Sequence, residues 1–282
     1  MIFLILAILS STAVSVVMRL SEKHIRSKTG MLMMNYIVCS VLAFALIPAK
    51  ENLPQVFSGQ NNGSFALWLG LINGFLYLVS FMLLQWNVSH NGVVLSALFM
   101  KLGILVPIVV AMIVFRETPG VLQWVGIAAA LAAILIMNLG KGQSLGKAAP
   151  GLIALLVIGG GGDALSKVYE QLGNAEYKDA FLLFTFFSAL LLCTLFWFIR
   201  DRHFSVKDAL FGVLIGVPNY LSARFLLHSL ESVPAVVAYP TYSAATIILI
   251  TGVGVLAFKE KLNSRKIIGL VIILAALVLL NL

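Results

Sequence analysis

Four charged side chains lie inside long apolar stretches of the chain, where charge is unusual: Lys101, Asp163, Lys167 and Arg224. An ionised side chain at the centre of a bilayer costs about 2.5–3.5 kcal/mol, so such a residue normally faces a cavity, a ligand or a partner of opposite charge. Three of the four are positive, and this balance favours an anionic or zwitterionic ligand over a lipophilic cation. We therefore take these four residues as the first candidates for substrate binding.

Two of these charges follow a glycine run in the sequence GGGGDALSK. The glycines are Gly159, Gly160, Gly161 and Gly162. Asp163 and Lys167 are four residues apart, so they share a helix face, either as a structural ion pair or as a pair that a substrate or a proton can separate. Asp163 is then the candidate for proton coupling. Glycine lowers helix stability by about 1 kcal/mol per residue relative to alanine, which predicts a hinge beside a cavity or a close helix–helix contact.

Arg224 lies in a polar stripe with Tyr220 and His228, at four-residue steps along one helix face. A guanidinium group is planar and can bind a carboxylate or a phosphate through two parallel hydrogen bonds. We expect Arg224 to line the cavity and to hold an acidic group of the substrate. The alternative is an arginine that is paired for structural reasons or that extends to the membrane interface.

Neutral polar residues can form the walls of the same cavity. The candidates are Tyr77, Tyr220, Tyr239, Tyr242, Asn35, Asn73 and Asn219. Each of them can equally serve packing or a hydrogen bond between helices. Prolines within the apolar stretches predict either gating hinges or static kinks, and the hinge candidates are Pro107, Pro218 and Pro240.

The elements that position these residues are helices that cross a membrane. Of the 282 residues, 61% are hydrophobic and 11% are charged, whereas a soluble domain has about a quarter charged residues. A spanning helix needs about 20 apolar residues. Such runs are expected at 2–20, 29–48, 65–87, 92–115, 120–139, 151–171, 180–199, 208–229, 233–257 and 264–282. The predicted fold class is an all-α polytopic membrane protein with ten transmembrane helices.

The basic residues predict the orientation of the chain, because Lys and Arg gather in cytoplasmic loops. The loops after the first, fifth, seventh and ninth expected helices carry 13 Lys and Arg, against 3 on the opposite face. This distribution places the basic face in the cytoplasm and both termini outside. We expect a multi-pass protein of the cytoplasmic (inner) membrane of a prokaryote.

The two halves of the sequence match at an offset of 143 residues. FRETPGVLQWVGIAAALAAILIMNL (115–139) aligns without gaps on FKEKLNSRKIIGLVIILAALVLLNL (258–282), with 8 of 25 positions identical. The same offset pairs Tyr77 with Tyr220. An odd number of spans per repeat inverts the second half in the membrane, which is typical of secondary transporters with a site near the repeat interface. We therefore expect two inverted five-helix repeats, 1–140 and 141–282, around a central cavity.

These features resemble the drug/metabolite transporter superfamily in its ten-helix EamA-type branch. The resemblance covers nearly the whole chain, and it rests on the repeated Phe-x-Glu at the end of each fourth helix and on the Gly and terminal Asn of each fifth helix. It implies a central cavity, alternating access and a small-molecule substrate. Members export amino acids, drugs or other metabolites, and relatives exchange nucleotide sugars or phosphorylated compounds.

The expected function is secondary active transport, coupled to protons or by exchange, of a small zwitterionic or anionic metabolite such as an amino acid. The alternatives are a multidrug exporter of lipophilic cations through Asp163, a channel, or a non-transporting receptor. The sequence has no HExxH, GxSxG or phosphate-loop motif and no metal-spaced histidines, so we expect neither an enzyme nor a bound cofactor or metal. The expected partners are the bilayer and the substrate, without nucleic acid, for a monomer or a homodimer.

Overall fold

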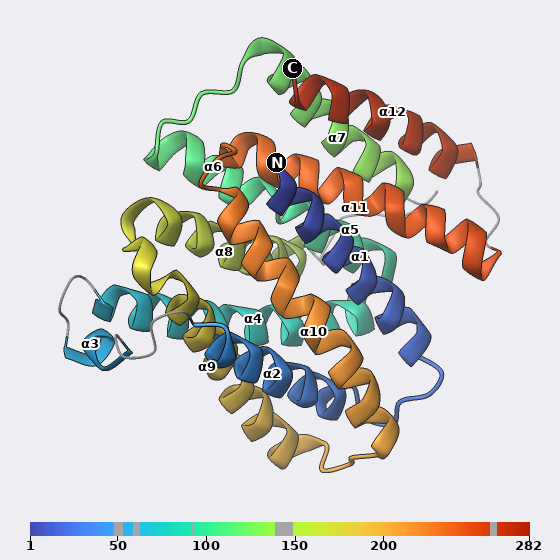
Figure 1. The fold of residues 1–282 in the computed structure, drawn as a ribbon. Coiled ribbons are helices and arrows are strands. Elements are labelled where there is room, and N and C mark those ends of the chain that lie inside the picture. Colours follow the sequence, from blue (N-terminus) through green and yellow to red (C-terminus); the bar gives the residue numbers. More distant parts are fainter. Residues whose placement is uncertain (48–52, 59–62, 92, 139–148, 260–263) are drawn as a thin grey trace. The chain divides into compact units, whose positions relative to one another are not determined.

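The computed structural model describes residues 1–282 except 48–52, 59–62, 92, 139–148 and 260–263. The described part consists of helices and their connections and contains no strand (Figure 1). In the first half of the chain the helices are α1 (Ile2–Ser21), α2 (Lys28–Ala45), α3 (Leu53–Ser58), α4 (Gly63–Asn91), α5 (Val93–Leu102), α6 (Leu105–Val114) and α7 (Val121–Asn138). In the second half they are α8 (Ala149–Leu172), the 3₁₀ turn η3 (Ala175–Tyr177), α9 (Lys178–Arg200), α10 (Val206–Ser229), α11 (Ala235–Phe258) and α12 (Ser264–Leu280).

Seven of the described helices are long and apolar enough to cross a membrane: α1, α2, α4, α8, α9, α10 and α11. Three further apolar helical segments, 99–114, 121–136 and 267–280, are shorter. The chain is therefore a multi-span membrane protein, and its described part is all-α with seven candidate spanning helices, where the sequence predicts ten.

The expected fourth helix, 92–115, is not continuous. It consists of α5 and α6, which are separated by a turn at Gly103 and Ile104. Pro107 is the third residue of α6, in the first turn, where a proline needs no helical N–H partner. The break therefore lies at the glycine, four residues before the proline that the sequence marks as a hinge.

The glycine run allows an opened helix, but α8 is not opened there. Helix α8 runs without a break through all four glycines. A Cβ atom on Gly160 would lie 2.0 Å from the backbone oxygen of Gly103, whereas one on Gly159 would only touch Ser80 Oγ at 3.4 Å. Gly160 thus allows α8 to pack directly on the turn between α5 and α6. The sequence permits a hinge or a close helix contact at this run, and the structure shows the close contact.

The other two hinge candidates lie inside continuous helices. Pro218 lies within α10 and Pro240 within α11, and neither helix is interrupted there. Each proline lacks an N–H group, so one intrahelical hydrogen bond is missing in each helix.

Contacts divide the chain into two compact units. Unit 1 comprises 1–78 and 165–231, and unit 2 comprises 79–164 and 232–282. Each unit takes helices from both halves of the sequence. The bounds of these two units do not coincide with the expected repeat boundary near residue 140. The contacts therefore do not test the repeats, which stay a prediction.

Within unit 1, a pair of glycines brings α4 against α9. A Cβ atom on Gly70 would lie 2.8 Å from the backbone oxygen of Phe181, and one on Gly74 would lie 2.2 Å from that of Thr185. Neither position has room for a side chain. The spacing of four residues places both glycines on one face of α4, as in other close helix crossings through small residues.

A second pair of glycines brings α10 against α2 in the same unit. A Cβ atom on Gly212 would lie 2.6 Å from the backbone oxygen of Met31, and one on Gly216 would lie 2.9 Å from that of Asn35. The two crossings together hold α2, α4, α9 and α10 around the polar residues described below.

At one end of unit 1, Asp208 joins two connections of the chain. Its carboxylate accepts hydrogen bonds from the backbone N–H groups of Arg26, at 2.8 Å, and of Ser205, at 2.8 Å, and Ser205 caps α10 in return. The connections between α1 and α2 and between α9 and α10 therefore meet on one side of this unit.

In unit 2, α7 and α12 lie side by side (Figure 1). A Cβ atom on Gly126 of α7 would lie 2.9 Å from Leu280 Cγ and 3.1 Å from the backbone oxygen of Ala276, both on α12. A buried apolar cluster of Ala133, Ile134 and Ile273 continues this contact.

Candidate functional site

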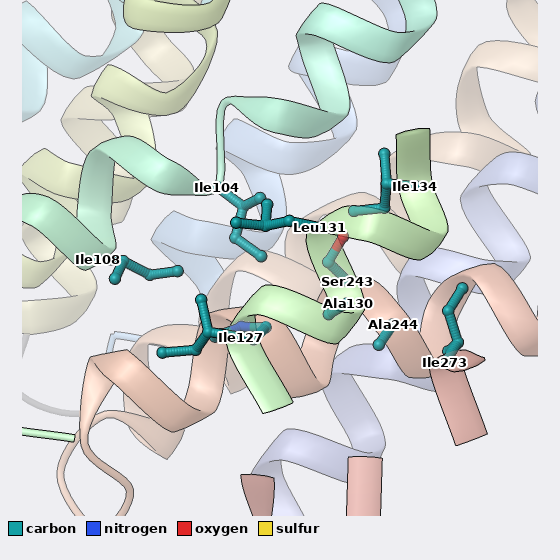
Figure 2. Close-up of a pocket in the computed structure, with 10 residues that line it drawn as sticks. Ile104, Ile108, Ile127, Ala130, Leu131, Ile134, Ser243, Ala244 and Ile273 are labelled. Carbon is teal, nitrogen blue, oxygen red and sulfur yellow. The ribbon is translucent and has the colours of Figure 1, made fainter. Parts of the chain in front are cut away.

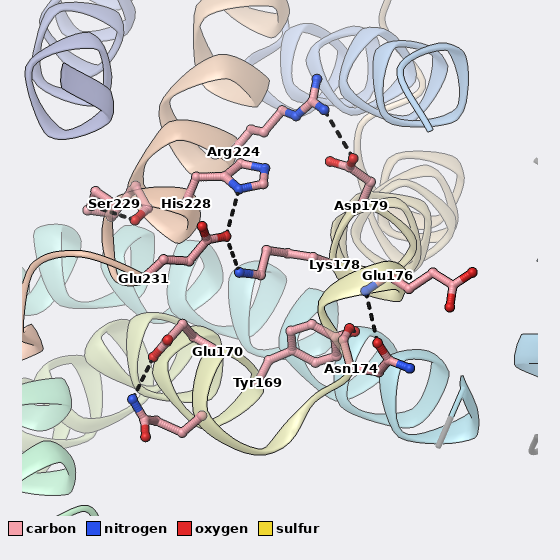
Figure 3. Close-up of polar contacts among 12 residues, drawn as sticks. Tyr169, Glu170, Asn174, Glu176, Lys178, Asp179, Arg224, His228, Ser229 and Glu231 are labelled. Atoms are coloured by element: carbon pink, nitrogen blue, oxygen red, sulfur yellow. Dashed lines mark hydrogen bonds and ion pairs between the residues drawn. The ribbon is translucent and has the colours of Figure 1, made fainter. Parts of the chain in front are cut away.

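The most prominent polar contact in unit 1 joins α9 and α10. Arg224 Nη2 donates to Asp179 Oδ2 at 3.0 Å, and the side chains are 21% and 9% exposed (Figure 3). Asp179 lies in the first turn of α9, where the helix dipole favours a carboxylate. Arg224 lies five residues before the end of α10, about 7–8 Å along the helix axis. The pair therefore lies near the ends of these helices rather than at their centres.

The buried oxygen atoms of unit 1 that have no hydrogen-bond partner among the described residues include Asp179 Oδ1, Tyr220 Oη and, on α4, Asn73 Oδ1. Tyr220 lies one helical turn before Arg224, and the charges of both Arg224 and Asp179 act on its hydroxyl group. Asn73 donates from Nδ2 to Thr185 Oγ1 at 3.4 Å. A buried oxygen atom without a donor costs about 1–3 kcal/mol, so these atoms favour a ligand or a water molecule that can donate.

A second set of charges borders the pair. The Lys178 ammonium group contacts Glu231 Oε1, and His228 Nδ1 lies 3.1 Å from the same oxygen (Figure 3). Burial acts to raise the pKa of Glu231, but the hydrogen bonds and charges of Lys178 and His228 lower it more, so the pKa lies below its usual value. This half-exposed cluster connects the start of α9 with the residues after α10.

Two of the predicted asparagines meet each other. Asn219 Nδ2 donates to Asn35 Oδ1 at 3.1 Å and joins α10 to α2. Cys39, buried beside them, donates to the backbone oxygen of Gly216 at 3.3 Å. Tyr77 packs against Phe186, with ring centroids 6.2 Å apart. These residues contribute amide, thiol and aromatic side chains to contacts between the helices of unit 1.

The Lys167 ammonium group has a carboxylate partner within α8. Its Nζ atom lies 2.9 Å from Glu170 Oε2, three residues later, and the two side chains are 1% and 11% exposed. The sequence suggests Asp163, one turn earlier, as the partner. In the structure the ion pair of Lys167 forms with Glu170.

Unit 2 contains the remaining candidates. Tyr239 is buried and donates from Oη to the backbone oxygen of Asp163 at 2.7 Å, which joins α11 to α8. Lys101 lies in the last turn of α5, two residues before the break. Tyr242 lies on α11, three residues after Tyr239.

Unit 2 also encloses a small cavity between α6, α7, α11 and α12 (Figure 2). Its volume of about 10 Å³ holds about one water molecule. Its lining is almost wholly apolar, with Ser243 as the polar exception. This cavity is too small and too apolar to hold a charged metabolite.

The structure thus brings Arg224 and Tyr220 together with one residue that the sequence does not single out, Asp179. Asp179 directly precedes the expected span 180–199, so the sequence assigns its charge to a loop. An available signal was the dipeptide Lys178-Asp179, in which opposite charges stand directly at the start of an apolar run.

Comparisons with known proteins agree with this architecture. The model of the EamA-like transporter family matches residues 1–139, and that of the Small Multidrug Resistance proteins matches residues 197–273. A solved crystal structure superposes with a TM-score of 0.77 at 14% identity, over 99% of this chain and 95% of that chain. At this identity the likeness concerns the fold alone.

Among curated proteins, an uncharacterized protein of Haemophilus influenzae is 24% identical over 97% of this chain and 95% of its own length. The multidrug resistance protein EbrA of Bacillus subtilis is 40% identical over 70 residues, which are 25% of this chain and 67% of that protein. EbrA of Bacillus licheniformis is 36% identical over 71 residues, 68% of its length. The chain therefore belongs to the drug/metabolite transporter superfamily, as an EamA-like membrane transporter, and is not an enzyme.

Proposed function

We propose that this transporter is a secondary active carrier that moves a small zwitterionic or anionic metabolite, such as an amino acid, by alternating access. The observation that carries the proposal is the Arg224–Asp179 pair, which lies beside buried oxygen atoms that have no donor among the described residues. In this proposal the Arg224 guanidinium binds the carboxylate or phosphate of the substrate, which is the geometry that a planar fork of donors favours.

The buried acceptors favour a substrate that also carries a donor. Asp179 Oδ1 can only accept hydrogen bonds, and Tyr220 Oη can accept one as well. An ammonium group offers three donors and can serve such a set. Arg224 and these oxygens together therefore fit a molecule that has one carboxylate and one amine. Further contacts within unit 1 are proposed for Lys167, Tyr77, Asn35 and Asn219. Asp163, Lys101, Tyr239 and Tyr242 belong to unit 2, and their contact with a substrate stays a prediction from the sequence.

We further propose that the chain consists of ten membrane helices in two inverted repeats, 1–140 and 141–282. The two glycine crossings of unit 1 support this proposal. Gly212 follows Gly70 by 142 positions, and Gly216 follows Gly74 by the same number. The pair on α10 faces the backbone oxygens of Met31 and Asn35. The pair on α4 faces those of Phe181 and Thr185, which lie 150 positions later in the chain. A glycine thus faces a backbone oxygen in both crossings, and the glycine pairs lie one position out of register with the offset of 143 that pairs Tyr77 with Tyr220. The range 121–138 also packs on α12, its counterpart in the repeat.

We also propose a location in the cytoplasmic membrane of a prokaryote, with both termini outside. The meeting of the connections α1–α2 and α9–α10 at Asp208 supports a common side for these two basic loops. The basic residues then face the cytoplasm.

This orientation predicts which introduced cysteines an impermeant maleimide labels on intact cells. Both native cysteines are buried, so the background is low. Lys23→Cys, on the exposed connection after α1, is expected to stay unlabelled, and Thr118→Cys, on the exposed connection between α6 and α7, is expected to react. The reverse pattern would place both termini inside.

A second candidate function is export of lipophilic cations. The resemblance to EbrA, whose name describes multidrug resistance, favours it. A cation would need an accessible carboxylate, and Asp163 is the proposed one. Proton binding at Asp163 would then compete with the cation.

Thermal stabilisation of the purified protein separates the two functions, because a ligand that binds only the folded state stabilises it by mass action. We expect stabilisation by amino acids or organic anions, and its loss in a variant with Arg224→Gln and Asp179→Asn. Stabilisation by ethidium alone, lost in Asp163→Asn, would instead establish the multidrug function.

A further inference from the structure

Asp179 is a buried carboxylate whose only cationic partner within hydrogen-bond distance, among the described residues, is the guanidinium that the proposed function assigns to the substrate. Its Oδ2 atom accepts from Arg224 at 3.0 Å, and its Oδ1 atom is buried without a described partner. The neighbouring Lys178 directs its ammonium group to Glu231 instead. The charge of Asp179 also acts on the hydroxyl groups of Tyr220 on α10 and of Tyr169 on α8.

A substrate carboxylate that binds Arg224 must therefore take the place of Asp179. A carboxylate that is 9% exposed and has lost its cation is strongly disfavoured in the charged state. Two species can remove this cost. One is a proton from water, and the other is a cationic group of the substrate itself.

We propose that Asp179 is the coupling residue of the carrier, and that it exchanges Arg224 for a proton or for the ammonium group of the substrate each time a carboxylate binds. This inference rests on the proposed function of Arg224. For a plain anion, the Arg224–Asp179 contact breaks, a contact between Arg224 and the anion forms, and one proton from water binds to Asp179. For a zwitterion, the ammonium group occupies Asp179 and no proton is taken up. The net charge of the occupied site is zero in both cases.

Propionate and alanine are matched probes for this exchange, because alanine is propionate with an added ammonium group. Titration calorimetry of the full-length protein in two buffers with different ionisation enthalpies measures the protons taken up per ligand. We expect about one proton per propionate and about none per alanine. The affinity for propionate should fall about tenfold for each unit that the pH rises, because binding then requires a proton that is scarcer. The affinity for alanine should change little.

Asp179→Asn removes the acceptor and is expected to bind propionate without proton uptake and independently of pH. Glu231→Gln is the matched control, since it removes the carboxylate that pairs with the neighbouring Lys178, and it should keep the proton uptake of the wild type. Propionate that binds the wild type without a proton, or alanine that takes up as many protons as propionate, would overturn the coupling role. If neither wild type nor Asp179→Asn binds either probe, the anion site at Arg224 fails, and the proposed function fails with it.

Discussion

Replacing Arg224 with glutamine is expected to lower transport of the carboxylate substrate by about 100-fold or more. The reason is that the variant loses a charged donor to the substrate carboxylate, and removing one partner of a buried charge pair costs about 2–5 kcal/mol of binding. Transport by the variant in proteoliposomes measures this effect. Arg224→Lys keeps the charge but lacks the planar pair of donors, and we expect it to recover only part of the loss.

Arg224→Gln alone also leaves Asp179 without a cation, which by itself destabilises a protein by about 3–5 kcal/mol when the carboxylate is buried. A double variant, Arg224→Gln with Asp179→Asn, removes both charges and should recover the thermal stability of the wild type. It should not recover transport. Wild-type transport by this double variant would exclude Arg224 from the mechanism and leave the pair as a structural contact.

Replacing Gly160 with alanine is expected to destabilise unit 2 strongly. The new Cβ atom would lie 2.0 Å from the backbone oxygen and 2.8 Å from the backbone carbon of Gly103. Backbone atoms cannot move aside as a flexible side chain can, so we expect a loss of about 3 kcal/mol in the free energy of unfolding. Thermal unfolding in detergent, together with the fraction of monodisperse protein, measures this loss.

Gly159→Ala is the matched control, one residue earlier in the same helix. Its Cβ atom would only touch Ser80 Oγ at 3.4 Å, an ordinary contact. Alanine also favours the helix by up to about 1 kcal/mol over glycine. This variant should be as stable as the wild type or more so. Equal damage by the two variants would mean that the glycines serve helix flexibility and not the contact with Gly103.

Much of the helical framework could be predicted from the sequence, because the apolar runs, the charges and the prolines mark where helices can begin and end. The break between α5 and α6 could not. The run 92–115 is apolar apart from Ser96 and Lys101, and only packing shows that Gly103 forms a turn against Gly160. For the same reason the four glycines predicted a hinge and a close contact equally well. The decision between them depends on what lies opposite the helix.

The candidate site was predictable in part. The sequence predicts Arg224 and Tyr220, because a charge and a hydroxyl group in an apolar helix need a partner. The identity of that partner was not predictable, since Asp179 lies 45 positions away in the chain, outside the expected span. Likewise Lys167 has two carboxylates within one helical turn in the sequence, and only the structure places its ammonium group on Glu170. Sequence spacing does not predict ion pairs between helices. It also does not predict which ion pair forms within one helix, because that depends on side-chain rotamers.

The most direct test of the central claim is exchange of a labelled substrate across proteoliposomes, with the compound that stabilises the wild-type protein most. The wild type should exchange external label for unlabelled substrate inside without ATP, and the Arg224→Gln, Asp179→Asn protein, reconstituted to the same amount, should not. Equal exchange by the two proteins would contradict a carrier site at Arg224. Exchange that is driven only by lipophilic cations and is abolished by Asp163→Asn would contradict an anionic or zwitterionic substrate.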